Sequence, residues 1–258
     1  MTAFNRIAIG LDAGAFARAT FDIDLDEWQR AAIESKHPRL AIAASRQSGK
    51  SVIASIIALR TTLYKSDQLV LVLSPSLRQS SYLFSSKIVA AARRLKAVDL
   101  LPVTITGITA TSITFSNGSR IVSLPDSEAT IRGYSNVSCL IADEASRISP
   151  ELFVAVRPML ATSKGRLVMV STPWIRQGDF YHAMTDDDSG FEIYKVSALE
   201  IDRISDDFLD EERKALGPFF ACEYLVEWLD TDSLTYFGYT EIQDALSDDV
   251  EPLFLDLD

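Results

Sequence analysis

The stretch Leu40-Ala41-Ile42-Ala43-Ala44-Ser45-Arg46-Gln47-Ser48-Gly49-Lys50-Ser51 decides the fold. An apolar strand is followed by a loop of small and polar residues that ends in Gly-Lys-Ser, and an apolar helix-forming segment, Val52 to Leu59, comes next. This order is typical of a phosphate-binding loop, because the loop amides and the positive end of the helix together form an anion site. The usual pattern has a glycine at the position of Ala44, so an ordinary strand-to-helix turn is the alternative interpretation.

The loop predicts a site for ATP and Mg²⁺. Lys50 would reach the β- and γ-phosphates, and the hydroxyl of Ser51 would be a ligand of Mg²⁺. Arg46 lies inside the loop, where its guanidinium can form two parallel hydrogen bonds to phosphate oxygens, although a solvated arginine would also fit there. The candidate nucleotide-binding residues of the loop are Ser45, Arg46, Gln47, Ser48, Gly49, Lys50 and Ser51.

A second motif follows about ninety residues later, where a predicted strand, residues 139–142, ends in Asp143 and Glu144. The carboxyl ends of strands in an α/β sheet are where ligands bind. Asp143 is expected to hold Mg²⁺, through water, and Glu144 is expected to polarise the water that attacks the γ-phosphate. A strand followed by an acidic turn, without function, is the alternative.

Two further motifs flank these. Ser171 and Thr172 follow a predicted strand over residues 167–170. Their hydroxyls could form hydrogen bonds to the γ-phosphate or to its attacking water, and could thereby report hydrolysis to the rest of the fold. The alternative is a strand that ends in a proline turn without function. Upstream of the loop, Trp28 could stack on an adenine while Gln29 bonds to its edge. The start of an amphipathic helix with Trp28 in the core is the alternative for that pair.

Several arginines need a role. Arg132 precedes Gly133 in a segment shortly before the second motif, and it is a candidate finger that reaches into a neighbouring subunit's site; a plain surface arginine is the alternative. A group of basic residues lies on or near one predicted helix and could contact DNA phosphates, although a solvated helix face is the favoured interpretation. This group consists of Arg78, Lys87, Arg93, Arg94 and Lys96.

Composition favours a protein of a reducing compartment. The 258 residues are 47% hydrophobic and 24% charged, no apolar stretch approaches the roughly 20 residues of a membrane helix, and the N-terminus has no convincing secretory signal. Two cysteines do not predict a disulfide framework, and two distant histidines make a zinc site improbable. The net charge of −11 is uneven: residues 186–258 carry 22 acidic and 4 basic residues, whereas residues 1–185 carry 14 acidic and 21 basic ones. A basic core does not exclude a nucleic-acid partner.

Apolar strands alternate with helical patterns, which predicts an α/β fold with a mainly parallel sheet. We expect buried strands at 40–43, 69–73, 139–142 and 167–170, a β-hairpin over 113–122 that turns at Asn117-Gly118, and a strand at 192–196. Helices are expected at 51–64, 81–96, 150–160, 206–215 and 218–228. The expected divisions are an ATPase core over 1–197, a small helical subdomain over 198–235 and a linker over 236–258.

The order of motifs resembles the ATPase domain of the large terminase subunit of tailed bacteriophages. The similar segments are Trp28-Gln29, Ser45-Arg46-Gln47-Ser48-Gly49-Lys50-Ser51, Leu73-Ser74-Pro75-Ser76-Leu77-Arg78-Gln79, the hairpin, Ile131-Arg132-Gly133, Asp143-Glu144-Ala145 and Ser171-Thr172-Pro173.

This resemblance implies an additional-strand, RecA-like P-loop NTPase that works as a ring on the viral portal. It would drive double-stranded DNA into a procapsid, with the portal protein and a small terminase subunit as partners, in the cytoplasm of the infected bacterial host and without a membrane partner. The resemblance also implies that Arg132 acts in trans, that Ser171 and Thr172 belong to the coupling motif, and that 198–235 is a lid. The family's RNase H-like nuclease would begin about where this sequence ends, so nuclease activity is not expected of this chain.

Three other classes of protein stay open. A superfamily-2-like helicase or remodelling ATPase shares the first three motifs, but the chain has no room for the second RecA-like domain that a helicase needs. A nucleotide-binding switch without turnover would not need the carboxylate of Glu144. A structural capsid or scaffold protein would leave the phosphate-binding loop unexplained.

Overall fold

Eight strands form one sheet in the computed structural model, which describes residues 3–125, 133–161 and 163–229. The strand order across the sheet is β3-β4-β5-β2-β6-β7-β1-β8, and all pairs from β5 to β8 are parallel. The strands are β1 (Arg39–Ala44), β2 (Leu69–Ser74), β3 (Ile105–Ile108), β4 (Ser112–Phe115), β5 (Arg120–Pro125), β6 (Cys139–Asp143), β7 (Arg166–Ser171) and β8 (Glu192–Val196). The prediction of an α/β fold with a mainly parallel sheet is confirmed.

The order of the central strands positions the site. β7 lies between β1, which leads into the phosphate-binding loop, and β6, which carries the carboxylates. In this register Ser171 is opposite Ala43, and Asp143 is opposite Val170. The ends of three parallel strands therefore bring the loop, the acidic pair and the hydroxyl motif to one edge of the sheet.

The edge formed by β3, β4 and β5 is antiparallel. The predicted hairpin is confirmed as β4 and β5, and the side-chain amide of Asn117 in its turn donates to the carbonyls of Thr62 (2.8 Å) and Lys65 (2.9 Å). The sequence did not predict β3, whose residues Ile105-Thr106-Gly107-Ile108 are only half-buried or exposed. A half-buried edge strand with a glycine carries a weak apolar pattern.

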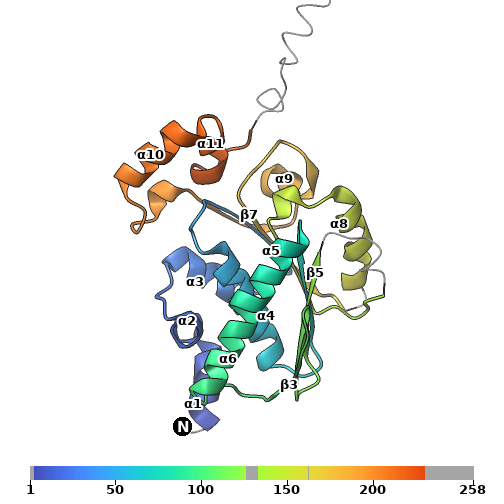
Figure 1. Ribbon diagram of the computed structural model, residues 1–258. Helices are drawn as coiled ribbons and strands as arrows, with labels where there is room; N and C mark the ends of the chain where they lie inside the picture. Colours follow the sequence, from blue (N-terminus) through green and yellow to red (C-terminus); the bar gives the residue numbers. More distant parts are fainter. Residues whose placement is uncertain (1–2, 126–132, 162, 230–258) are drawn as a thin grey trace, which may run out of the picture.

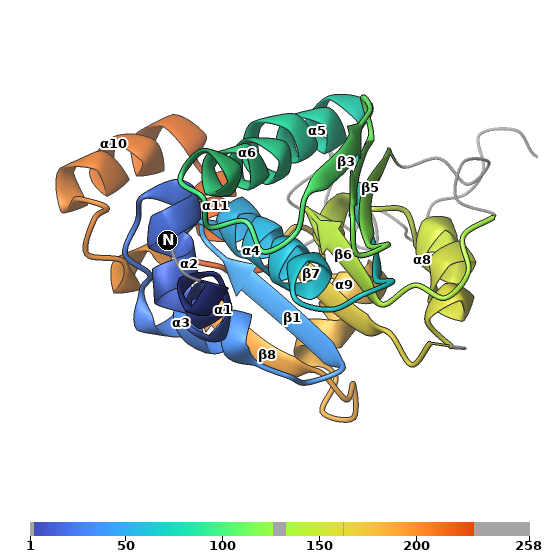
Figure 2. The same cartoon turned by 90° about the horizontal axis from the view of Figure 1, so that it is seen from below.

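Helices cover both faces of the sheet (Figures 1 and 2). Along β1, Leu40, Ile42 and Ala44 point into one apolar core, whereas Ala41 and Ala43 point into the other, as the two-residue period of a strand requires. The first core is covered by α1 (Ala3–Leu11), α2 (Ala13–Phe21), α3 (Glu27–Glu34), α4 (Lys50–Leu63) and the helix that contains α5 (Leu77–Tyr82), the π-helical turn η1 (Leu83–Val89) and α6 (Ala90–Ala97). The second core is covered by α8 (Pro150–Val156) and α9 (Gly178–Thr185).

Some helix predictions need correction. The helix expected over 81–96 is longer, because it begins at α5 and contains a π-helical turn, and the one expected over 150–160 changes to the 3₁₀ turn η3 (Arg157–Leu160) after α8. α1, α2 and α9 were not predicted, and a helix at the position of α3 was expected only in the alternative interpretation of Trp28 and Gln29. The helix expected over 218–228 ends at Tyr224, because Val226 adopts a positive φ of 61° and Leu229 then pairs with Ile175 in a β-bridge.

A third, small apolar cluster follows β8. The 3₁₀ turn η4 (Ala198–Glu200), α10 (Asp206–Leu216) and α11 (Phe219–Tyr224) contribute Ala198, Leu209, Phe220 and Tyr224 to it. α10 and α11 lie at the end of the molecule opposite α1 (Figure 1). The division at 198–235 stays a prediction, and the linker expected over 236–258 lies outside the described residues. In the described part, no helix has the length and apolar character needed to span a bilayer.

Candidate nucleotide-binding site

The loop between β1 and α4 has the backbone of an anion-binding turn. Gly49 caps α4 with a φ of 91°, and a Cβ there would lie 2.7 Å from the amide nitrogen of Gln29. That amide donates to the carbonyl of Ser48 at 2.7 Å, and the guanidinium of Arg203 donates to the same carbonyl at 3.0 Å. Only glycine combines the positive φ with this close approach. The loop is thus held in shape by side chains from α3 and from the segment after β8.

Lys50 is buried at the first turn of α4, with 7% of its surface exposed. Its ammonium donates to the carbonyls of Ala44 (2.9 Å) and Ser45 (2.8 Å). Burial lowers the pKa of Lys50, and the negative charges of Glu144 and Asp143 act against this shift. A buried cation that faces the loop from its inside is placed to meet an anion held by the loop amides.

Asp143 lies buried at the end of β6, and its Oδ1 has no hydrogen-bond partner among the described residues. Burial, and then the neighbouring charge of Glu144, raise the pKa of Asp143 to about 7, although Lys50 acts in the opposite direction. An unpartnered buried carboxylate oxygen is costly unless a cation or a proton meets it. The half-buried Ser51 at the start of α4 is the second expected ligand, since Mg²⁺ usually takes one or two protein oxygens beside phosphates and waters.

The described residues contain no cluster of three or more acidic, histidine or cysteine side chains that could bind a metal alone. Mg²⁺ is usually held by one or two protein oxygens together with a nucleotide, and its assignment to Ser51 and Asp143 stays a prediction.

Glu144 is held in an unusual backbone conformation at the same edge. Its φ of 54° places it in the left-handed region, and its carboxylate accepts a hydrogen bond from the hydroxyl of Ser171 at 3.2 Å. The hydroxyl of Ser146 is 2.8 Å from that of Ser171. A strained residue whose side chain is held by a neighbouring strand is typical of an active site. The second and third motifs are thus in direct contact, which the sequence analysis did not predict.

A cavity of about 250 Å³ opens beside Glu144, and the sequence interpretation gave no role at the site to three of its residues, Gln79, Arg147 and Glu223. Glu223 of α11 is buried, and its carboxylate accepts from Arg46 Nε at 3.1 Å and from Arg147 Nη2 at 3.3 Å. The guanidinium of Arg147 also lies 3.9 Å above the ring of Trp174. The residues that line the cavity are Arg46, Gln79, Glu144, Arg147, Thr172 and Glu223.

These contacts tie the segment after β8 to both nucleotide motifs. The backbone N–H of Arg46 donates to the carbonyl of Glu223 at 2.8 Å, in addition to the side-chain contact. Arg147 follows Glu144 by three residues, so its place on the same turn was a signal that the sequence offered. Glu223 gave no such signal, because it is one of many carboxylates in an acidic region.

The other residues predicted for the site are Trp28, Gln29 and Arg132, and only the first two lie in the described part of the chain. Trp28 packs partly against the first core, and it also lines a hollow of about 670 Å³ beside Arg203. Both polar atoms of the Gln29 side chain form hydrogen bonds within the chain: its nitrogen donates to the carbonyl of Ser48, and its oxygen accepts from the N–H of Asp26 at 2.9 Å. Adenine recognition by Trp28 and Gln29 stays a prediction. Arg132 lies outside the described residues.

Among family models, that of the terminase large subunit, T4likevirus-type, N-terminal, matches residues 41–244. This range contains the phosphate-binding loop, the acidic pair and the hydroxyl motif. The chain belongs to this family. No curated protein matches it.

Solved large terminases have the same fold at low sequence identity. The Thermus phage P74-26 large terminase ATPase domain is 17% identical, with a TM-score of 0.70, over 82% of this chain and 97% of that one. The large terminase of a thermophilic bacteriophage is 12% identical (TM-score 0.66; 80% of this chain and 54% of that one), and that of bacteriophage HK97 is 16% identical (TM-score 0.64; 85% and 55%). The chain spans about half the length of these last two terminases. The fold is therefore that of terminase ATPase domains of the P-loop type.

Proposed function

We propose that this terminase chain hydrolyses ATP to drive double-stranded DNA into a procapsid. The observation that carries the proposal is the meeting of two buried, opposite charges at one sheet edge: Lys50 under the loop and Asp143 with a free oxygen. Each is costly by itself, and a magnesium nucleotide would satisfy both. Structures of the thermophilic bacteriophage's large terminase with ADP and with ATP-γ-S show that a similar fold binds adenine nucleotides.

In the proposed reaction, the loop amides and Lys50 hold the β- and γ-phosphates. Ser51 and Asp143 would hold Mg²⁺, which neutralises charge on the phosphates when it is bound. Glu144 orients the attacking water and accepts its proton, and Ser171 keeps that carboxylate in position through its hydrogen bond. Arg46 and the proposed trans finger Arg132 would stabilise the charge that develops on the transferred phosphoryl group.

The proposed setting is a ring of subunits on the portal, in the cytoplasm of an infected bacterium, with a small terminase subunit as a further partner. Thr172, which is buried beside Glu144, and Ser171 would pass the state of the nucleotide to the rest of the fold. Residues 198–229, tied to the loop through Arg46 and Glu223, would follow the nucleotide as a lid.

The decisive experiment compares binding with turnover. Saturating Mg-ATP-γ-S should raise the melting temperature of the wild type and of Glu144→Gln, because a ligand at a hundred times its Kd stabilises the folded state by about 2.7 kcal/mol. Lys50→Ala should lose this shift. Turnover should fall about 10²–10⁴-fold in Glu144→Gln.

Glu151→Gln is the matched control, because Glu151 is an exposed carboxylate in the first turn of α8, and it should leave both properties unchanged. If Mg-ATP-γ-S does not change the melting temperature of the wild type, the proposed nucleotide-binding site is refuted. Unchanged turnover in Glu144→Gln would refute the role of Glu144, whereas a wild type that binds the nucleotide without turnover would favour a nucleotide-binding switch.

A further inference from the structure

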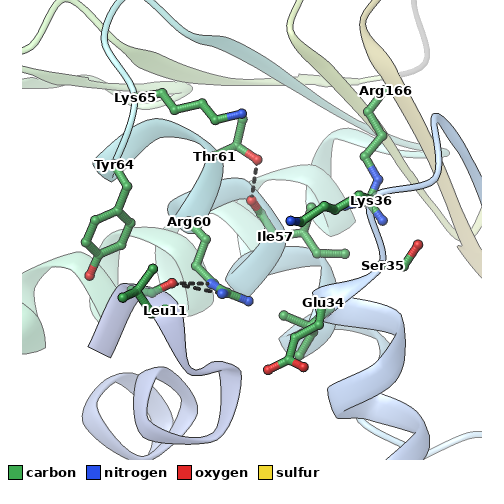
Figure 3. Close-up of a pocket in the computed structure, with 12 residues that line it drawn as sticks. Leu11, Glu34, Ser35, Lys36, Ile57, Arg60, Thr61, Tyr64, Lys65 and Arg166 are labelled. Carbon is green, nitrogen blue, oxygen red and sulfur yellow. Dashed lines mark hydrogen bonds between the residues drawn. The ribbon is translucent and has the colours of Figure 1, made fainter. Parts of the chain in front are cut away.

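A basic hollow lies at the edge of the sheet opposite the nucleotide site. Arg39 and Arg166 begin β1 and β7, so this is the amino-terminal edge, and a strand of six residues places it about 20 Å from the loop. Two adjoining hollows of about 570 and 370 Å³ share Ser35, Lys36, Thr61, Lys65 and Arg166 in their walls. Figure 3 shows Lys36, Lys65 and Arg166 extending into the larger one.

The positive charges of the hollow are only partly paired within the part of the chain that the structure describes. Lys36, Lys65 and Lys164 are exposed, and none of them forms an ion pair with a described residue. Arg166 Nη2 is buried without a hydrogen-bond partner in the described part, while its Nε donates to the carbonyl of His37 at 3.1 Å. Many arginines elsewhere in the chain are paired with carboxylates, so this group is a local excess of positive charge.

The negative groups nearby do not cancel this charge. Glu34 lines the larger hollow and accepts from the N–H of Ala13 at 3.3 Å. Glu192 faces Arg166, and it accepts hydrogen bonds from Ser35 and Tyr194. The C-terminal end of α4 adds about half a negative charge from its helix dipole. Four cations therefore outweigh two carboxylates and a dipole end, even without Arg60, which donates to the carbonyl of Gly10.

We infer that Lys36, Lys65, Lys164 and Arg166 form a binding site for backbone phosphates of double-stranded DNA. Three exposed ammonium groups around a half-buried guanidinium suit phosphates, which accept hydrogen bonds in many directions and carry charge at a regular spacing. The identification of the ligand as DNA rests on the proposed packaging function. The site would let the ATPase hold DNA at a surface separate from the one where it holds ATP.

The test is the binding of a 30-bp duplex by the whole chain, followed by fluorescence anisotropy at several salt concentrations. In Lys36→Gln/Lys65→Gln/Lys164→Gln, affinity at 100 mM salt should fall about 10-fold or more, and the slope of log K against log salt should lose about 0.9 for each phosphate contact removed. Basal ATPase activity and the melting temperature should stay at wild-type values, since these side chains are exposed and far from the loop.

Lys87→Gln/Lys96→Gln/Lys214→Gln is the matched control, because it removes the same charge elsewhere. Lys87 and Lys96 belong to the basic group for which a solvated helix face is favoured over DNA contact, so this variant should bind the duplex like the wild type. Wild-type affinity and slope in the first variant, or an equal loss in the control, would overturn the assignment. So would polyglutamate binding that exceeds duplex binding and is lost in the first variant, which would indicate an acidic protein partner. A wild type that binds no duplex at 50 mM salt would refute DNA binding, and with it the translocation part of the proposed function, whatever the ATPase assays show.

Discussion

Replacement of Glu223 by glutamine should weaken the link between the segment after β8 and the nucleotide motifs. The carboxylate is the common acceptor for Arg46 and Arg147, and only 10% of its side chain is exposed. Glutamine has the same size as glutamate but no charge. Its NH₂ group would replace one of the two carboxylate oxygens, so one of the two guanidinium groups would face a donor instead of an acceptor. The backbone bond from Arg46 to residue 223 stays in place in the variant.

The magnitude follows from the exposure of the partners. A hydrogen bond to a charged group contributes about 1.5–3 kcal/mol when buried, and an exposed ion pair contributes about 0–1 kcal/mol. The side chain of Arg46 is 59% exposed and that of Arg147 is 35% exposed, so water can solvate both once the carboxylate is gone. We therefore expect Glu223→Gln to lower the free energy of unfolding by about 1–2 kcal/mol, less than the 3–5 kcal/mol typical of a fully buried pair.

Urea unfolding followed by tryptophan fluorescence measures this change, and Trp174 under Arg147 is well placed to report it. Glu227→Gln is the control, because Glu227 is exposed on the same segment and should change the free energy by less than about 0.5 kcal/mol. A double-mutant cycle with Arg46→Met isolates the pair, and a coupling near 0.5–1 kcal/mol is expected. A free energy of unfolding equal to that of the control, with zero coupling, would show that Glu223 does not hold the segment.

Two further predictions concern the loop and the acidic motif. Gly49→Ala should lower the free energy of unfolding by about 1–2 kcal/mol because of its φ of 91°, and by a further amount because the new Cβ would lie 2.7 Å from Gln29. Gly190→Ala is the control, because Gly190 has a φ of 68° and open space around it, so only the backbone cost is expected there. Equal losses of free energy in a urea titration would contradict the close approach at Gly49. Ser171→Ala removes one hydrogen bond to Glu144, so turnover should fall about 2–10-fold while the shift in melting temperature with Mg-ATP-γ-S persists, and loss of that shift would place Ser171 in binding instead.

The sequence predicted the central strands because each is a short, nearly continuous apolar segment, as expected of strands covered on both faces. It did not predict β3, α1, α2 or α9, whose patterns are short or mixed. The predicted end of α11 was wrong because the positive φ of Val226 turns the chain, and Leu229 then forms a β-bridge with Ile175, about fifty residues earlier in the sequence. Local propensity carries no information on such pairings.

For the site, the sequence by itself determined the chemistry: a loop that ends in Lys50, an acidic pair at 143 and 144, and hydroxyls after another strand. Each group follows its strand directly, so chain order alone places it at the carboxyl end of that strand, whereas the strand order in the sheet brings the groups to one edge. Only the tertiary structure decided what surrounds them. The burial that shifts the pKa of Asp143, the clamp of Glu223 on two arginines, and the convergence of Lys36, Lys65, Lys164 and Arg166 at the opposite edge all depend on residues brought together from distant parts of the chain. Residue type and spacing along the sequence do not show these contacts, because the residues are far apart along the chain and meet only in the folded structure.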